Sequence, residues 1–161
     1  THARRLRVLA EMVPTWSSTV LDVGCGAGHL IDYGMKIMKP SYQGIDVLPD
    51  MIAAAKQRHP GWRFEVGDIA HPKEEWAADI VLASGLFQFG TLSFVEETIT
   101  TMFRLCRVGV GANFLRTGNA DECIVNPLHI LRHALTLSQY ATLRMDYLPN
   151  DFTLYLYKER P

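Results

Sequence analysis

The stretch that decides the fold is Val20-Leu21-Asp22-Val23-Gly24-Cys25-Gly26-Ala27-Gly28. The apolar run from Thr19 to Val23 predicts a short strand, and the alternating glycines predict a tight turn before a helical pattern that starts at His29. Glycines let the chain bend sharply and let the backbone approach a ligand that a Cβ atom would block. The stretch therefore predicts a ligand-binding turn between a strand and the helix that follows it.

The rest of the chain alternates strand-like and helical segments, which predicts βαβ units and a mostly parallel sheet. Four further strands are expected at 42–47, 62–66, 79–84 and 108–115, and an entry helix at 4–13. Two runs of alternating polarity, 141–147 and 152–158, predict a terminal hairpin. We therefore expect one domain over residues 1–161, a doubly wound α/β sheet of five parallel strands plus a C-terminal antiparallel β-hairpin, with helices on both faces.

Two of the expected helices carry capping signals at their starts. Ser93 and Glu96 have the spacing of a capping box, and the apolar stripe that follows is interpreted as core. Asn126 followed by Pro127 predicts another start, because an asparagine side chain can accept a first-turn N–H and proline fits the first helical position.

The charge balance excludes a strong general attraction to nucleic acid or to anionic membranes. The 161 residues include 16 Lys and Arg against 17 Asp and Glu, a formal net charge of −1. His2, Arg4, Arg5 and Arg7 form a short basic cluster on the entry helix. A solvated helix face is the favoured interpretation of this cluster, and a phosphate-binding arm is the alternative.

The three cysteines, Cys25, Cys106 and Cys123, have no metal-type spacing, and an odd number gives no disulfide framework. A reducing compartment such as the cytoplasm is therefore expected. No apolar run has transmembrane length and no signal peptide is recognisable. The chain starts with Thr1 rather than Met, so we expect it to be part of a longer polypeptide.

Three acidic residues lie at or near the carboxyl ends of predicted strands, where an α/β sheet binds its ligand. Asp46 ends the second strand about 20 positions after the glycine turn, where a carboxylate can accept hydrogen bonds from ribose hydroxyls. Asp68 ends the third strand and is placed to accept from an adenine amino group while Ile69 packs on the ring. Asp22 lies beside the turn and suits a cationic ligand. His29 stands where the dinucleotide fingerprint needs a glycine, which argues against a pyrophosphate.

These motifs resemble those of the class I S-adenosylmethionine-dependent methyltransferases. The glycine motif, Gly44-Ile45-Asp46 and Gly67-Asp68-Ile69 match as they stand, between about Thr19 and Ser84. The resemblance implies a Rossmann-like fold and a transferase that uses S-adenosyl-L-methionine and releases S-adenosyl-L-homocysteine. The residues that it implies for cofactor binding are Asp22, Gly24, Cys25, Gly26, Gly28, Asp46, Val47, Met51, Asp68, Ile69, Ser84 and Gly85.

By the same resemblance, the glycines flank the methionine part of the cofactor, Asp46 the ribose, and Asp68 the adenine, with Val47 and Met51 near the ring. Asp22 would orient the loop or meet the amino group. Cys25 could suggest a nucleophile, but its position inside the turn favours a small packing residue.

The methyl acceptor is expected outside the carboxyl ends of the strands, where open α/β sheets bind ligands. Methyltransferases that act on amino groups of bases or of glutamine usually carry Asn/Asp-Pro-Pro-aromatic after the fourth strand. This chain has Ser84-Gly85-Leu86-Phe87 there, so a small molecule, a lipid head group or a sugar is favoured. The candidate substrate contacts are Phe87, Asn113, Arg116, His129, Tyr147 and Asp151.

Several alternatives stay open. His129 and His133 are four residues apart, but no third ligand is evident, so no metal is expected and His129 is a candidate base. Tyr147 and Asp151 fit equally well as ordinary hairpin residues. An NAD(P)-binding oxidoreductase and a non-catalytic partner on a decayed methyltransferase fold are the competing functions. A general base is needed only for a hydroxyl or a protonated amine acceptor, so the catalytic residues, the acceptor atom and the oligomeric state stay unassigned.

Overall fold

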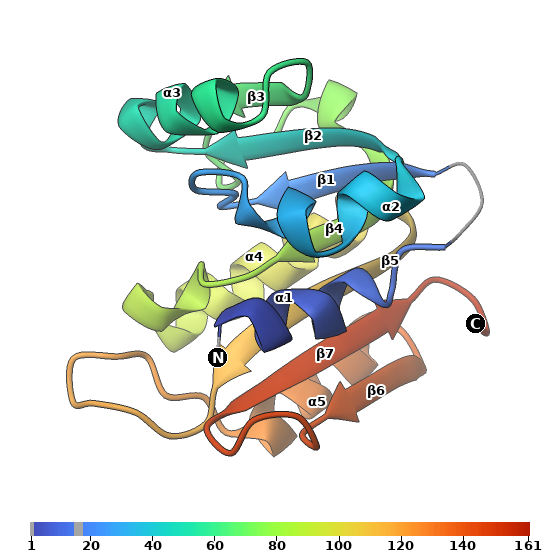
Figure 1. The fold of residues 1–161 in the computed structure, drawn as a ribbon. Coiled ribbons are helices and arrows are strands. Elements are labelled where there is room, and N and C mark those ends of the chain that lie inside the picture. The colour runs from blue at the N-terminus through green and yellow to red at the C-terminus, as the bar shows by residue number, and fades with distance from the viewer. Residues whose placement is uncertain (1, 15–17) are drawn as a thin grey trace.

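The computed structural model describes residues 2–14 and 18–161, and the seven strands in these ranges form one sheet (Figure 1). The strands are β1 (Thr19–Val23), β2 (Ser41–Asp46), β3 (Arg63–Val66), β4 (Ala78–Ala83), β5 (Cys106–Leu115), β6 (Tyr140–Arg144) and β7 (Asp151–Tyr157). Their order across the sheet is β3-β2-β1-β4-β5-β7-β6. The first five pair in parallel, and β7 runs antiparallel to both of its neighbours. The predicted sheet and hairpin are confirmed, and the last strand of the chain lies inside the sheet.

Burial on both faces explains why the inner strands are nearly continuous apolar runs. Ile80, Val81 and Leu82 of β4 are completely buried, as are Phe152 and Leu154 of β7. The edge strand β6 is only half-buried and carries more polar side chains. The core therefore extends across the sheet from β1 to β7.

Helices cover both faces, as a doubly wound sheet requires. One face carries α1 (His2–Ala10), the π-helical segment η1 (Ile31–Met35) that continues into α2 (Lys36–Met38), and α3 (Pro49–Arg58). The other face carries α4 (Leu92–Leu105) and α5 (Pro127–Leu137), with the short 3-10 segments η2 (Glu74–Trp76) and η3 (Phe87–Phe89) nearby (Figure 1). Each face has its own apolar cluster, so two half-cores sandwich the sheet.

The two expected helix starts have different outcomes. Asn126 caps α5 as predicted, because its side chain accepts a hydrogen bond from the Leu128 N–H at 2.9 Å. The capping box at Ser93 is wrong. Thr91 has the extended backbone of a cap and accepts from the Phe94 N–H at 3.1 Å, whereas Ser93 already lies in the helix and donates to Glu97.

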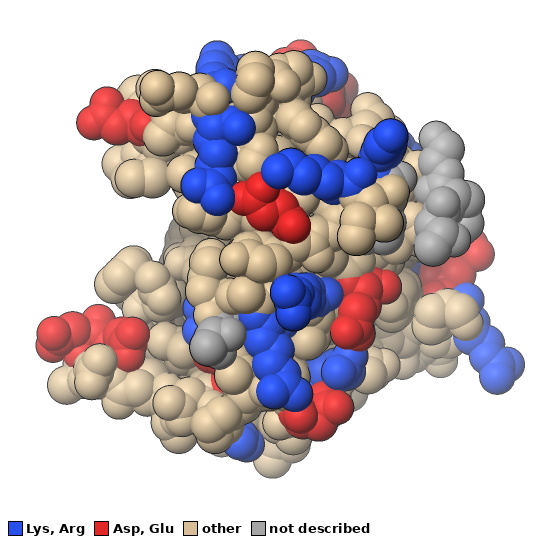
Figure 2. Space-filling model, in the orientation of Figure 1, with Lys and Arg blue, Asp and Glu red and all other residues tan. Residues whose placement is uncertain are grey.

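The parallel pairing brings the site residues to one edge of the sheet. Val23 of β1 is opposite Ile45 of β2 and Ala83 of β4, so the glycine turn, Asp46 and Ser84 leave adjacent strands together. Asp46 is in turn opposite Val66, which places the end of β3 at the same edge. Figure 2 shows the molecule hollowed at this edge, on the left of the view. This is where an open α/β sheet binds its ligand.

Candidate active site

The glycine turn is tied to the end of β2 by its own backbone. The N–H groups of Gly24 and Cys25 both donate to the Ile45 carbonyl, at 2.9 and 3.0 Å. Gly24, Gly26 and Gly28 all have positive φ angles, from 52° to 77°, which only glycine adopts without strain. The sequence pattern of alternate glycines is therefore explained by the path of the chain.

Asp46 holds the turn from the neighbouring strand. One of its carboxylate oxygens accepts from the Gly26 N–H at 2.9 Å, and the other accepts from the Leu48 N–H at 2.9 Å. Two backbone donors on one carboxylate fix both the turn and the start of α3. Asp46 therefore positions the turn, a role that the spacing alone did not reveal.

The turn faces open space that a ligand could fill. A Cβ atom built on Gly26 or on Gly85 would find no atom of another residue within 4 Å. In Ser84, the residue before Gly85, the hydroxyl oxygen is buried and has no hydrogen-bond partner in the described part of the chain. Buried polar atoms normally have partners, so an unpaired hydroxyl beside an open cradle points to a bound molecule.

Asp22 is buried beside this cradle. Its carboxylate accepts a hydrogen bond from the Tyr42 hydroxyl at 2.7 Å. Burial raises the pKa of Asp22 to about 7, with a smaller contribution from the negative charge of Asp46, while the Tyr42 hydrogen bond opposes the rise. Burial also raises the pKa of the Cys25 thiol, so this cysteine is a packing residue and not a reactive thiolate.

The third strand end combines an exposed carboxylate with apolar side chains. Asp68 is half-exposed, and the Ala70 N–H and the His71 ring hold its pKa below the usual range. Ile69 beside it is buried. Val47 and Met51 remain 57% and 39% exposed, so their apolar surface is available to a flat ring.

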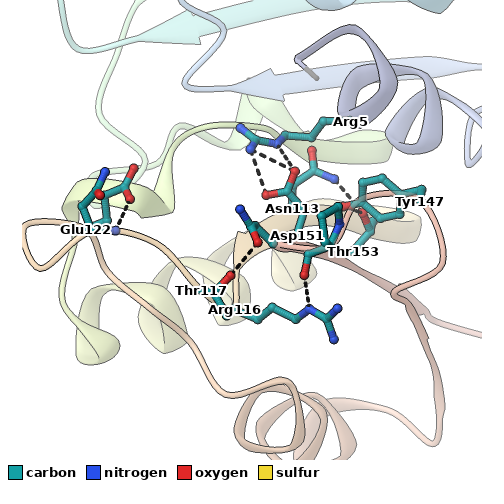
Figure 3. Close-up of polar contacts among 11 residues, drawn as sticks. Arg5, Asn113, Arg116, Thr117, Glu122, Tyr147, Asp151 and Thr153 are labelled. Atoms are coloured by element: carbon teal, nitrogen blue, oxygen red, sulfur yellow. Dashed lines mark hydrogen bonds and ion pairs between the residues drawn. The ribbon is translucent and has the colours of Figure 1, made fainter.

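A second polar group lies around the ends of β5 and β7 (Figure 3). Arg5 of α1 reaches across to Asp151 and donates to both carboxylate oxygens, at 2.9 to 3.1 Å. The expectation that the basic cluster is a solvated helix face is therefore wrong for Arg5, because its guanidinium is mostly covered and paired with a buried carboxylate. The contact joins residues that are 146 positions apart, which no local pattern reveals.

Asn113, Tyr147 and Thr153 form a buried cluster next to this ion pair (Figure 3). The Asn113 amide nitrogen donates to the Thr153 hydroxyl at 2.6 Å, and the Tyr147 hydroxyl lies 2.8 Å from the same oxygen. Burial raises the pKa of Tyr147. The remaining oxygen of the Asn113 amide has no hydrogen-bond partner within the described ranges.

Two hollows lie beside these residues. A cleft of about 440 Å³ is bounded by the start of α1, the loop 117–122 and the turn 148–151. A small cavity of about 10 Å³ lies against Gly85, Asn113 and Phe114. Arg5 and Leu115 line both hollows, so the cleft and the cavity are neighbours.

Three other candidate substrate contacts have structural partners. The Phe87 ring is 2% exposed and stacks on Phe114 at 4.9 Å, so it belongs to the core and offers only a wall to the cavity. Arg116 donates to the Pro149 carbonyl at 2.8 Å and ties the loop to the hairpin turn (Figure 3). His129 lies 2.6 Å from the Glu96 carboxylate, within the contact between α4 and α5. Residues 2–14 and 18–161 bring together no group of three or more His, Cys, Asp or Glu side chains that could hold a metal.

Comparison with known proteins identifies the family. Residues 20–109 match the family described as a methyltransferase domain. A protein of Mycobacterium tuberculosis that is provisionally named a methyltransferase is 30% identical over 159 residues, which cover 87% of this chain and 93% of that protein. The chain belongs to the class I S-adenosylmethionine-dependent methyltransferases.

Other relatives match this methyltransferase over a smaller part of their length. A trans-aconitate 2-methyltransferase of Methylobacterium nodulans is 30% identical over 83 residues, which are 51% of this chain and only 32% of that enzyme. The structure of magnesium protoporphyrin IX methyltransferase from Synechocystis, with bound SAH, superposes with a TM-score of 0.79 at 14% identity, covering 98% of this chain and 83% of that one. A TehB-like methyltransferase from Corynebacterium glutamicum gives a TM-score of 0.75 at 20% identity, covering 96% and 88%. These structures confirm the Rossmann-like fold.

Sequence reasoning missed two residues that organise the site of this methyltransferase. Tyr42 is paired with Val20 in the sheet register, and its hydroxyl reaches Asp22 two residues further along β1. Thr153 is completely buried and joins Asn113 to Tyr147. The register between strands sets both contacts, and a single sequence carries no signal for it.

Proposed function

We propose that this methyltransferase binds S-adenosylmethionine in the cradle at the glycine turn and transfers its methyl group to a small molecule bound in the neighbouring cleft. The unpaired Ser84 hydroxyl beside the open space at Gly26 and Gly85 carries the proposal. When bound, the cofactor supplies an electrophilic sulfonium methyl, and the protein must bring the acceptor in line with it. The cleft beside Arg5, which neighbours the small cavity at Gly85, has room for such an acceptor.

The described side chains fit three parts of the cofactor, which are the ribose, the adenine and the amino group. Asp46 at the end of β2 would accept from the ribose hydroxyls while it holds the turn. Asp68 would accept from the adenine amino group, with Val47 and Met51 against the ring. Asp22 would face the positively charged amino group from beneath the turn. The glycines 24, 26 and 28, Cys25, Ile69, Ser84 and Gly85 complete the proposed set.

Calorimetry with S-adenosylhomocysteine and NADH tests this function directly. We expect the methyltransferase to bind the homocysteine product and not the dinucleotide, because the turn carries His29 where a pyrophosphate needs a glycine. A Ser84→Ala variant, which removes only the hydroxyl, should bind the homocysteine product more weakly. Binding of NADH alone would refute the proposal.

Cofactor affinity should depend on pH through Asp22. The carboxylate form attracts the cationic amino group, and a pKa of about 7 means that this form is present above pH 7 and is lost as the pH falls. We expect the affinity for S-adenosylmethionine to fall about tenfold between pH 7.5 and pH 6. An Asp22→Asn variant should bind weakly with a flat profile over this window. A wild-type profile as flat as that of the variant would show that Asp22 does not meet the cofactor.

We place the acceptor among small molecules, and we propose that residues 1–161 act as one catalytic domain. Positive and negative side chains alternate over the surface in Figure 2, which offers no large basic face to a nucleic acid. None of the helices in the described ranges is long and apolar enough to cross a bilayer. The three cysteines are free thiols, which supports the proposed cytoplasmic location.

A further inference from the structure

We propose that the unpaired Oδ1 oxygen of Asn113 accepts a hydrogen bond from the amino group of the methyl acceptor, so that this enzyme methylates a small amine. The inference rests on the function proposed above and names the substrate class of the same site. It starts from an unsatisfied polar atom that the cofactor does not explain.

Asn113 is held rigidly and still has one unused group. Its side chain is 3% exposed, and its nitrogen is fixed by the hydroxyl of Thr153, which β7 carries in the sheet register directly opposite. Its Oδ1 oxygen is buried and unpaired in the described part of the protein. A buried polar group without a partner is unfavourable, so a donor from a bound molecule is the expected partner.

The space in front of Asn113 has the size of one small group. The cavity of about 10 Å³ is walled by Gly85 and by the rings of Phe87 and Phe114. Such a volume accommodates roughly one water-sized group. An amino or hydroxyl group fits it, whereas the two oxygens of a carboxylate do not. Gly85 lies two residues beyond the end of β4 and belongs to the proposed cofactor-binding set, so the cavity adjoins the proposed cofactor site.

The larger cleft would hold the rest of the acceptor, and its charges disfavour a polycarboxylate. Arg5 is already neutralised by Asp151 through two carboxylate oxygens. Burial lowers the pKa of His2, with smaller contributions from His29 and Arg5, which disfavours the charged form of this ring. Glu122 contributes a carboxylate that accepts from the Asn119 N–H, so the cleft favours a neutral or cationic molecule.

An amine that enters the site unprotonated satisfies the chemistry of the cavity without a base. A neutral amine can donate one N–H to Asn113 Oδ1 while its lone pair faces the methyl group. The new C–N bond forms as the C–S bond of the cofactor breaks, and the methylated ammonium later releases its proton to solvent. A hydroxyl would need a base, and the neighbouring groups provide none: both Asp151 oxygens are occupied by Arg5, and burial raises the pKa of Tyr147. A carboxylate has no hydrogen to donate to Oδ1.

Transfer of labelled methyl groups to a low-molecular-weight cell extract tests this inference before the acceptor is identified. The protein of residues 1–161 is incubated with tritiated-methyl S-adenosylmethionine, and the product is treated with alkali and passed over a cation exchanger. We expect a labelled product, separated by chromatography from unreacted S-adenosylmethionine (itself a cation), that resists alkali and is retained as a cation. Release of labelled methanol would reveal an ester, and a stable neutral product would reveal an ether; either result overturns the inference. Binding of S-adenosylhomocysteine without any transfer would instead overturn the small-molecule function, and the inference with it.

Variants of Asn113 test whether methyl transfer depends on this residue. Asn113→Ala should lower label transfer about tenfold while the affinity for S-adenosylhomocysteine stays within about twofold of the wild type. Asn113→Asp keeps an acceptor oxygen at the same place and should recover part of the transfer. The exposed Gln139→Ala on the edge of the sheet is the matched amide control and should behave as the wild type. Full transfer by Asn113→Ala would remove Asn113 from the acceptor site, and cofactor binding reports whether each variant is folded.

Discussion

Asp46→Ala is expected to weaken binding of S-adenosylhomocysteine by about 2–3 kcal/mol, which is roughly a 30- to 150-fold loss of affinity. The loss has two sources. The proposed hydrogen bonds to the ribose disappear, and so do the two bonds that hold the Gly26 and Leu48 N–H groups. The turn would then have to be ordered by the ligand itself, at an additional cost in binding free energy.

Isothermal titration of the purified variant measures this change. Asp50→Ala is the matched control, because Asp50 is an exposed carboxylate four residues away in the first turn of α3. Asp46→Asn should give an intermediate loss, since one acceptor oxygen remains. Equal affinities for Asp46→Ala and the wild type would remove Asp46 from the cofactor site.

Asp151→Ala is expected to lower the free energy of unfolding by about 3 kcal/mol, because it leaves the largely covered guanidinium of Arg5 without its counter-charge. For a chain of this length the melting temperature should fall by roughly 6–12 °C. Thermal unfolding followed by circular dichroism gives the value. The effect should be large because the pair joins the first helix to the last strand.

A double-mutant cycle separates the ion pair from simple loss of packing. Arg5→Ala combined with Asp151→Ala should cost clearly less than the sum of the single changes, since neither charge is then left alone. Asp146→Ala is the comparison, because Asp146 pairs with Arg144 in the exposed hairpin region and should have little effect. Additive single effects would show that Arg5 and Asp151 do not stabilise each other.

Local sequence patterns predicted the residues on the cofactor side of the site. The three glycines with positive φ, Asp46 at the end of β2 and Asp68 at the end of β3 all follow from residues close together in the chain. The positions of the strands were equally accessible, because buried parallel strands are apolar runs between turn residues. β1 begins and ends as expected, whereas β6 ends at Arg144, three residues before its predicted end.

The acceptor half depends on contacts that only the folded chain reveals. Arg5 meets Asp151 over 146 positions, and Asn113 meets Thr153 over 40. Phe87 was expected to face the acceptor, but it is drawn into a stack with Phe114 because three aromatic rings pack together behind the cavity. The capping box was predicted at the wrong residue because Thr91 and Ser93 are both residue types that can cap a helix. Thr91 has the extended backbone of a cap, whereas Ser93 already lies within α4.

The position of β7 between β5 and β6 has a consequence for biosynthesis. During translation, β5 leaves the ribosome with an open edge that stays unpaired until residues 151–157 have been made. Two further contacts wait for the same segment: the salt bridge to Arg5 and the hydrogen bond from the Tyr155 hydroxyl to the Val8 carbonyl. The nascent polypeptide therefore cannot complete this tertiary structure until residues 151–157 have left the ribosome, and a truncation that removes them would delete an interior strand of the sheet.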